Sequence, residues 1–233
     1  LKALGGRPLD RLWLLAGLAL IVNIVPNMLP STPKYGGVRL FLPAMAWLGV
    51  LAALALERIV RRLRVAVPVA SERGWMISVL VVTLALLPSV AEVGHFHPYC
   101  LSAYNGLIGG LPGAAKAGME PTYWGDTYLA AAYWLTHNAP PGAIVWIEPQ
   151  GMESVVRMYK YLGPLRRDLQ TTAGEATFAM ADFVVSQNKP TEFTDKVRRL
   201  VETKKPIWTE GIDGVPLIFV WHMRSEQDDN GVN

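Results

Sequence analysis

The sequence GWMISVLVVTLALLPSVA at residues 74–91 runs for 18 residues without an Asp, Glu, Lys or Arg. An α-helix rises about 1.5 Å per residue, so roughly 17–25 apolar residues cross the hydrocarbon core of a bilayer, which is about 30 Å thick. Two earlier stretches, at residues 12–33 and 40–56, are also free of charge and mostly apolar. The sequence therefore predicts an all-α membrane region at residues 1–96. Its three transmembrane helices are expected at about residues 12–30, 39–57 and 74–92.

The basic residues that flank these stretches predict their orientation. Residues 1–96 hold ten Lys/Arg and four Asp/Glu, whereas residues 97–233 hold twelve and fifteen. Five arginines lie between the second and third stretches: Arg58, Arg61, Arg62, Arg64 and Arg73. A nucleic-acid-binding patch has a similar composition, but short basic loops beside membrane spans remain cytoplasmic. We therefore expect an integral membrane protein whose residues after 96 face outward, without a nucleic-acid partner.

The residues after 96 alternate between helical and strand patterns. Helical periodicity predicts helices at 127–137, 152–162 and 192–203, the first with Asp126 as its N-cap. Short apolar runs predict strands at 143–148, 168–172, 181–186, 206–210 and 217–222, with a turn at 211–214 between the last two. This order predicts a small extracytoplasmic α/β domain at 97–224, followed by a disordered polar tail at 225–233.

The start of the chain and its single cysteine give two further expectations. The chain begins with Leu1 and lacks the charged start, short apolar run and cleavage site of a signal peptide. We expect it to be the C-terminal part of a longer protein, because three helices make a small membrane domain for a sizeable enzyme. Cys100 alone excludes an intrachain disulfide and a multi-cysteine metal site, and an ordinary buried thiol is expected there.

The segment from His97 to Asp126 follows the third apolar stretch directly, so it is expected at the outer membrane surface. It gathers tyrosines and Trp124 beside Asn105 and Glu120. Aromatic rings stack on the apolar face of a sugar, and carboxylates and amides accept hydrogen bonds from its hydroxyls. The same composition is typical of an interfacial aromatic belt with turn glycines. Composition alone favours the aromatic belt.

Five motifs lie in or before this segment: Arg39-Leu-Phe-Leu-Pro43, His97-Pro98-Tyr99, Tyr104-Asn105, Gly109-Gly110-Leu-Pro-Gly113-Ala114 and Tyr123-Trp124-Gly125. Together they resemble motifs of bacterial glycosyltransferase family 39, the relatives of dolichyl-phosphate-mannose–protein mannosyltransferases. The resemblance covers about residues 35–150, whereas residues 151–233 match no motif. It implies the end of a larger helical bundle of the GT-C type in a bacterial plasma membrane. Such a protein transfers a mannose-like sugar from a polyprenyl-phosphate donor to a protein, glycan or lipid acceptor on the outer face.

The resemblance also implies roles for individual residues. The family's acidic catalytic pair lies in a first outer loop that this sequence does not contain, so we expect no catalytic residue and no activity from the chain alone. Arg39 and Lys34 are expected near the lipid phosphate, which arginine binds bidentately. Snorkelling to lipid headgroups explains Arg39 equally well and Lys34 better. The residues expected to bind substrate are Asn105, Glu120, Tyr123 and Trp124.

Other kinds of site have weaker support. His95 and His97 alternate like two ligands on one strand face, but zinc requires further ligands, and none lies at motif spacing. The glycine run at 106–118 lacks the Gly-Lys-Ser/Thr ending of a P-loop. We expect no metal or cofactor bound through this chain, and a divalent metal in the full-length protein stays open. The main alternative function is a membrane-anchored α/β binding or scaffold module without enzymatic activity. A transporter, which requires charged groups in mid-membrane, ranks third.

Overall fold

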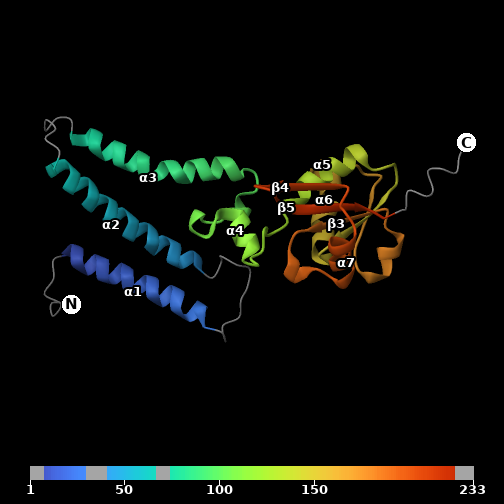
Figure 1. Ribbon diagram of the computed structural model, residues 1–233, viewed down its shortest axis with the longest axis horizontal. Helices are drawn as coiled ribbons and strands as arrows, with labels where there is room; N and C mark the ends of the chain where they lie inside the picture. The colour runs from blue at the N-terminus through green and yellow to red at the C-terminus, as the bar shows by residue number, and fades with distance from the viewer. Residues whose placement is uncertain (1–7, 30–40, 67–73, 224–233) are drawn as a thin grey trace, which may run out of the picture. The chain divides into compact units, whose positions relative to one another are not determined.

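A computed structural model describes residues 8–29, 41–66 and 74–223 (Figure 1). The chain divides after Val90 into two compact units. Arg39 and Lys34 lie outside the described residues, as does the tail expected at 225–233.

The first unit is built from helices that are long and apolar enough to cross a membrane (Figure 1). They are α1 (Pro8–Met28), α2 (Leu42–Ala66) and α3 (Gly74–Phe96), whose last residues belong to the second unit. At most 6% of each candidate span is buried inside the protein. Because these apolar side chains are exposed in the absence of lipid, a bilayer is their natural surrounding. The predicted three apolar helices are confirmed, and they mark an integral membrane protein.

Two of these helices extend beyond the charge-free stretches that predicted them. α2 continues through Glu57 and the arginines to Ala66, where Glu57 and Arg61 form an i,i+4 pair at 3.7 Å. α3 continues past Glu92 to Phe96. Charged residues therefore mark where a helix leaves the hydrocarbon, whereas the helix itself ends where its hydrogen bonds end.

Helices α1 and α2 pack against each other. Ala16 and Ala44, one on each helix, are fully buried, and small residues of this kind allow helix backbones to approach closely. The Arg58 guanidinium lies 4.4 Å from the centroid of the Trp13 ring. These contacts hold the start of the basic cluster against α1.

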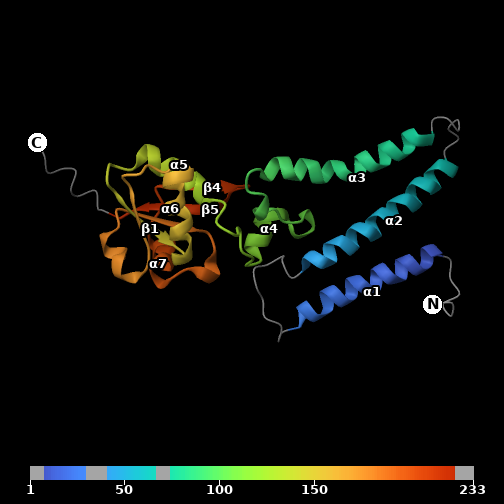
Figure 2. The same ribbon diagram turned by 180° about the vertical axis from the view of Figure 1, so that it is seen from behind.

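The second unit is an α/β domain around a mixed five-stranded sheet with the order β2-β1-β3-β5-β4 (Figures 1 and 2). The strands are β1 (Ile144–Glu148), β2 (Gln170–Thr172), β3 (Phe183–Gln187), β4 (Trp208–Ile212) and β5 (Val215–His222). The helices are α4 (Gly110–Lys116), α5 (Tyr128–Asn138), α6 (Glu153–Leu162) and α7 (Asp195–Thr203). β1 pairs in parallel with β2 and β3, whereas β5 is antiparallel to β3 and β4. The predicted α/β domain is confirmed, although α4 was not predicted.

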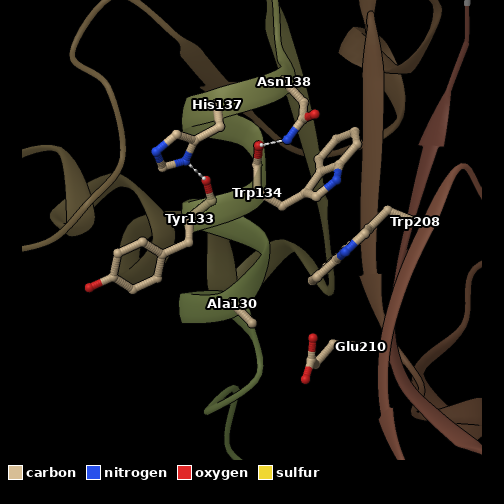
Figure 3. A pocket seen from close by; sticks show the side chains of 7 residues that line it. All are labelled: Ala130, Tyr133, Trp134, His137, Asn138, Trp208 and Glu210. Atoms are coloured by element: carbon tan, nitrogen blue, oxygen red, sulfur yellow. Dashed lines mark hydrogen bonds between the residues drawn. The ribbon is translucent and has the colours of Figure 1, made fainter.

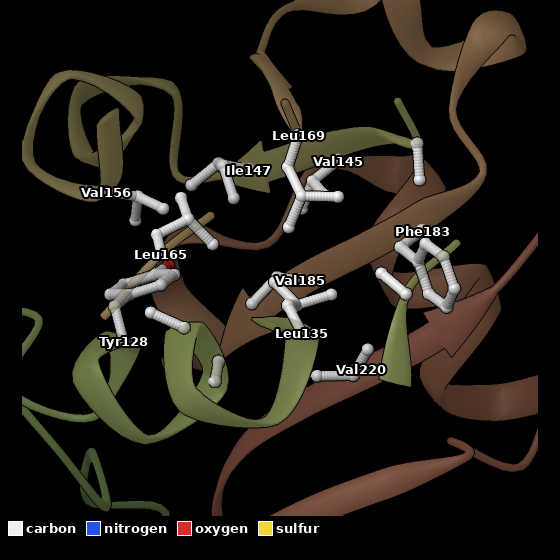
Figure 4. Packing of buried hydrophobic residues seen from close by; sticks show 14 of the residues in the cluster. Tyr128, Leu135, Val145, Ile147, Val156, Leu165, Leu169, Phe183, Val185 and Val220 are labelled. Atoms are coloured by element: carbon white, nitrogen blue, oxygen red, sulfur yellow. The ribbon is translucent and has the colours of Figure 1, made fainter. Parts of the chain in front are cut away.

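Both faces of the sheet are covered at its centre, which explains why β1, β3 and β5 are mostly apolar runs without alternation, whereas β2 and β4 at the two edges carry polar residues. Figure 4 shows one face, where Val145 and Ile147 of β1 and Val185 of β3 pack with Tyr128 and Leu135 of α5. The intervening residues point to the other face. There the packed residues are Trp146, Val184, Phe219 and Trp221 of the sheet with Val197 and Leu200 of α7.

β4 and β5 form a hairpin closed by Asp213 and Gly214, with φ of 52° and 76°. A type I′ turn requires positive φ at both central residues, and Asp-Gly is a favoured pair for it. The turn is shorter than predicted, because Gly211 and Ile212 still pair with β5.

The chain changes direction across the sheet at β1, since β2 lies on one side of it and β3 on the other. Open α/β sheets bind ligands in the crevice outside the carboxyl ends of the strands at such a point. In this domain that edge is formed by the ends of β1 and β3, at Glu148 and Gln187. We call it the switch-point edge.

Candidate functional site

The loop before α5 is tied to the switch-point edge by hydrogen bonds. Gln187 donates from Nε2 to the Thr122 hydroxyl (3.1 Å), which in turn donates to Asp126 Oδ1 (3.3 Å). The Tyr128 hydroxyl donates to the carbonyl oxygen of Glu148 and accepts from the backbone N–H of Gln187 (3.3 Å). The loop is therefore fixed to the ends of both β1 and β3.

Two of the residues predicted to bind substrate, Glu120 and Tyr123, lie together in this loop, next to Tyr104, which precedes α4. The Tyr104 hydroxyl donates to the carbonyl oxygen of Glu120 (2.7 Å) and lies 3.4 Å from the Tyr123 hydroxyl. Oε1 of Glu120 accepts from the backbone N–H of Thr191 (3.1 Å), which follows β3. Oε2 of Glu120 is buried and has no hydrogen-bond partner within the part of the chain that the structure describes. We call Tyr104, Glu120, Tyr123, Trp124 and Asp126 the loop site.

Trp124 has an unusual backbone conformation in this loop. Its φ is 63° and its side chain is 55% exposed. Bulky residues rarely adopt positive φ, and holding one there costs on the order of 1–3 kcal/mol. Gly125 follows with φ of 76°, and a Cβ at this position would lie 2.1 Å from Cε of Met152. The Tyr-Trp-Gly motif thus has a geometric reason for its glycine.

Asp126 does not cap α5 as the sequence predicted. The N-cap position belongs to Thr127, whose side chain makes no capping hydrogen bond. Oδ2 of Asp126 is buried and, among the described residues, unpaired. Burial raises the pKa of Asp126, although hydrogen bonds from Thr122 and from the backbone N–H of Thr127 act in the opposite direction.

The loop site is rich in acceptors and protonated hydroxyls. Burial, with smaller effects of Glu210 and Asp126, raises the pKa of Tyr99 to about 12. Burial also raises the pKa of Tyr104, helped by its hydrogen bond to Tyr123. Within the described ranges, no carboxylate of the loop site forms an ion pair with Lys or Arg. This chemistry suits a neutral, hydroxyl-bearing ligand and does not suit a phosphate.

Asn105 has a local role. Its side-chain oxygen accepts from the backbone N–H of Leu107 (2.7 Å) and caps the short 3₁₀ helix Gly106–Ile108. The capping bond uses one of the two lone pairs of this oxygen, and the substrate-binding role of Asn105 stays a prediction.

A second carboxylate lies at the switch-point edge. Glu148 ends β1 with only 4% of its surface exposed, and its Oε1 accepts from the backbone N–H of Thr194 (3.1 Å), the N-cap residue of α7. Burial raises the pKa of Glu148. A cavity of about 120 Å³ lies beside it, lined in part by Thr194 and Lys196. The sequence analysis missed Glu148, and its place at the carboxyl end of the first strand was the available signal.

A larger groove of about 470 Å³ lies between α5 and the edge strand β4 (Figure 3). It is lined by Ala130, Tyr133, Trp134, His137, Asn138, Trp208 and Glu210, and we call it the aromatic groove. The indoles of Trp134 and Trp208 are stacked, with centroids 5.8 Å apart and planes at 22°. Glu210 lies beside them, two residues after Trp208 on β4 (Figure 3). The sequence analysis missed this groove, because no local pattern shows that α5 and β4 lie side by side.

His95 and Cys100 do not lie in a cluster of metal-ligating side chains among the described residues. His95 Nε2 lies 2.9 Å from Asp213 Oδ1 in the β4–β5 turn. Cys100 is exposed, so the expected buried thiol is wrong; it lies in the short 3₁₀ helix Cys100–Ser102 rather than in the core. In the described part of the chain, no group of three or more His, Cys, Asp or Glu side chains could hold a metal ion.

Comparisons with known proteins give no relative for this chain. No family model, no curated protein and no solved structure matches it. The resemblance to glycosyltransferase family 39 therefore rests on the five sequence motifs alone.

Proposed function

We propose that the chain is the C-terminal part of a membrane glycosyltransferase. It transfers a mannose-like sugar from a polyprenyl-phosphate donor to a protein, glycan or lipid acceptor. The orientation follows from the arginines at the end of α2, which belong on the cytoplasmic side of a bacterial plasma membrane. The end of α3 and the α/β domain then lie on the outer face.

The observation that carries this proposal is the conformation of Trp124 in the loop site. A strained, exposed indole persists where the surrounding structure holds it, and such residues gather at functional sites. The hydroxyls of Tyr104 and Tyr123 and the unpaired Oε2 of Glu120 lie in the same loop site. The loop site thus combines an exposed aromatic ring with hydroxyls and a carboxylate, and this combination supports sugar recognition.

The chemistry of transfer divides between two parts of the protein. Displacing a lipid phosphate from an anomeric carbon requires a base for the acceptor hydroxyl and cations for the developing phosphate charge. Among the described residues no Lys or Arg pairs with the carboxylates of the loop site, which supports assigning it to sugar or acceptor hydroxyls. The phosphate is assigned to Arg39 and Lys34, and the base to the acidic pair that the resemblance implies elsewhere in the full-length protein.

The experiment is a transfer assay on the full-length gene product in membrane vesicles, with polyprenyl-phosphate [³H]mannose as donor. Trp124→Gly relieves the backbone strain, since glycine adopts positive φ without cost. We expect it to leave the amount of folded protein unchanged and to lower transfer more than about tenfold, the effect of removing an aromatic anchor. The control is Leu107→Gly, whose side chain is 94% exposed in the same segment.

Arg39→Ala tests the phosphate assignment in the same vesicles, where we expect a sharp loss of transfer with normal membrane insertion. Near-normal transfer by Trp124→Gly would contradict the role of the loop site. Absence of transfer by the unmodified protein with any lipid-linked hexose would favour the alternative, a membrane-anchored binding or scaffold module.

A further inference from the structure

The geometry points to the aromatic groove as a binding subsite for a neutral oligosaccharide of hexopyranose rings. This inference goes beyond the proposed transfer reaction, because it assigns a second sugar-binding surface that acts by binding alone. The occupant is a glycan, such as an extended acceptor, and not the phosphate-bearing donor.

The floor of the groove is a rigid aromatic platform. Trp134 and Trp208 stack on each other, and Trp134 also meets Phe183 edge-on, with centroids 6.2 Å apart and planes at 72°. Both indoles pack against the core of the domain while lining the groove (Figure 3). Rings that are fixed before binding offer apolar area at a low cost in conformational entropy. The C–H face of a pyranose ring is the matching surface.

Around this platform lie polar atoms that have no partner within the described residues. Among the described residues, neither the Trp208 indole N–H nor the Glu210 carboxylate has a hydrogen-bond partner. Asn138 donates from Nδ2 to the carbonyl of Trp134 (2.8 Å), which leaves its side-chain oxygen as an acceptor. His137, another lining residue, donates from Nδ1 to the carbonyl of Tyr133 (2.8 Å), so this nitrogen is not open to a ligand. A few such groups around an apolar floor give a site its orientation and specificity.

Size and charge narrow the class of ligand. A volume of about 470 Å³ lies within the roughly 300–1,000 Å³ range of small-molecule pockets, which is far more than a single ion requires. Glu210 supplies the only Asp, Glu, Lys or Arg charge of the lining, and it is negative. An anionic sugar or a sugar phosphate would be repelled there, whereas sugar hydroxyls donate to a carboxylate. The groove therefore favours neutral hexoses.

The test is saturation-transfer difference NMR on the full chain in lipid nanodiscs, with linear mannohexaose as the probe and cellohexaose as a second hexose polymer. Nanodiscs are required because maltoside detergents carry a sugar headgroup. We expect saturation of ring C–H protons. Trp208→Ala should weaken binding at least about tenfold, as removal of a central aromatic anchor does. Glu210→Gln preserves side-chain shape and keeps the test valid if Trp208→Ala fails to fold. It should weaken binding about five- to tenfold, because the amide oxygen still accepts a hydrogen bond but a neutral one is roughly half as strong as a charge-assisted one.

The control is Tyr161→Ala, an aromatic residue on α6 that is 73% exposed and lies outside the groove lining. It should bind as the unmodified protein does, and so should Trp124→Gly, which separates this subsite from the proposed transfer site. Absence of saturation transfer with both oligosaccharides would overturn the inference. Unchanged binding in both Glu210→Gln and folded Trp208→Ala would also overturn it. If the groove instead bound a peptide that mannohexaose does not displace, the groove would be assigned to a protein partner.

Discussion

Removal of the Tyr128 hydroxyl should loosen the switch-point edge without making a cavity. The hydroxyl is the shared partner of the Glu148 carbonyl and the Gln187 N–H, so it links the ends of β1 and β3. Tyr128 is 1% exposed and Gln187 is 3% exposed, so water does not readily replace the lost bonds. Tyr128→Phe keeps the ring in the core and deletes only this link.

The expected loss follows from the buried polar groups that the substitution leaves. A buried donor or acceptor without its partner costs about 1–3 kcal/mol. Since about 1.4 kcal/mol corresponds to a tenfold change in an equilibrium constant, local opening at this edge should become about 5- to 150-fold more frequent. The effect should be confined to the ends of β1 and β3 and to the start of α5.

The assay is hydrogen–deuterium exchange of the full chain in nanodiscs, read in peptides that cover β1 and β3. The matched control is Tyr161→Phe, the same change at a tyrosine that is 73% exposed. Exchange in Tyr128→Phe within about twofold of the unmodified protein, or an equal effect of Tyr161→Phe, would refute the argument that this hydroxyl holds the edge together.

Asp126 and Asp168 should make the stability of the fold depend on pH in opposite directions. Burial raises the pKa of Asp126 in the folded state, so its ionisation opposes folding. Asp126→Asn should therefore unfold at a higher temperature than the unmodified protein at pH 7, and the difference should disappear as the pH falls below the unfolded pKa. Asp168 behaves in the opposite sense, because Arg166 and the N–H of Gly142 hold its pKa at about 2. The stability that ionised Asp168 contributes is fully present above the unfolded pKa near 4 and is lost as the pH falls toward 2. In Asp168→Asn, the melting temperature should therefore fall less steeply between about pH 4 and 2 than it does in the unmodified protein.

The sequence was sufficient to predict the strands of the α/β domain and its helices α5, α6 and α7, but not α4. β1 and β3 are short apolar runs because both of their faces are buried, and such runs are visible without any long-range information. The ends of strands and helices were predicted less accurately, because hydrogen bonds and not composition decide where an element begins and stops. α7, for example, begins at Asp195 after its Thr194 cap, whereas periodicity suggested a start at 192.

The sites could be predicted only where their residues are neighbours in sequence. Glu120 and Tyr123 lie in one loop, and Tyr104 lies shortly before it, ahead of α4. The aromatic and acidic composition of this segment was visible in the sequence. Trp134 and Trp208 come from α5 and β4, which meet only because β4 occupies the edge beyond β5. That strand order depends on how the hairpin packs beside β3, and no local pattern of residues records it.

The distribution of charge connects the two proposals. The loop site and the aromatic groove both combine aromatic rings with carboxylates that, among the described residues, pair with no lysine or arginine. The excess of basic residues lies instead in residues 1–96, where ten Lys/Arg accompany four Asp/Glu. A lipid-linked sugar carries its phosphate at the membrane and its hydroxyls beyond it. In the proposed orientation only Lys34 and Arg39 of these basic residues face outward, and the others flank the cytoplasmic ends of the helices. Under the proposed transfer reaction these two cations would meet the phosphate of the donor, whereas the carboxylates and aromatic rings of the α/β domain would meet its hydroxyls. The same reasoning implies that substitutions in the α/β domain should change selectivity among sugars and acceptors more than affinity for the lipid phosphate.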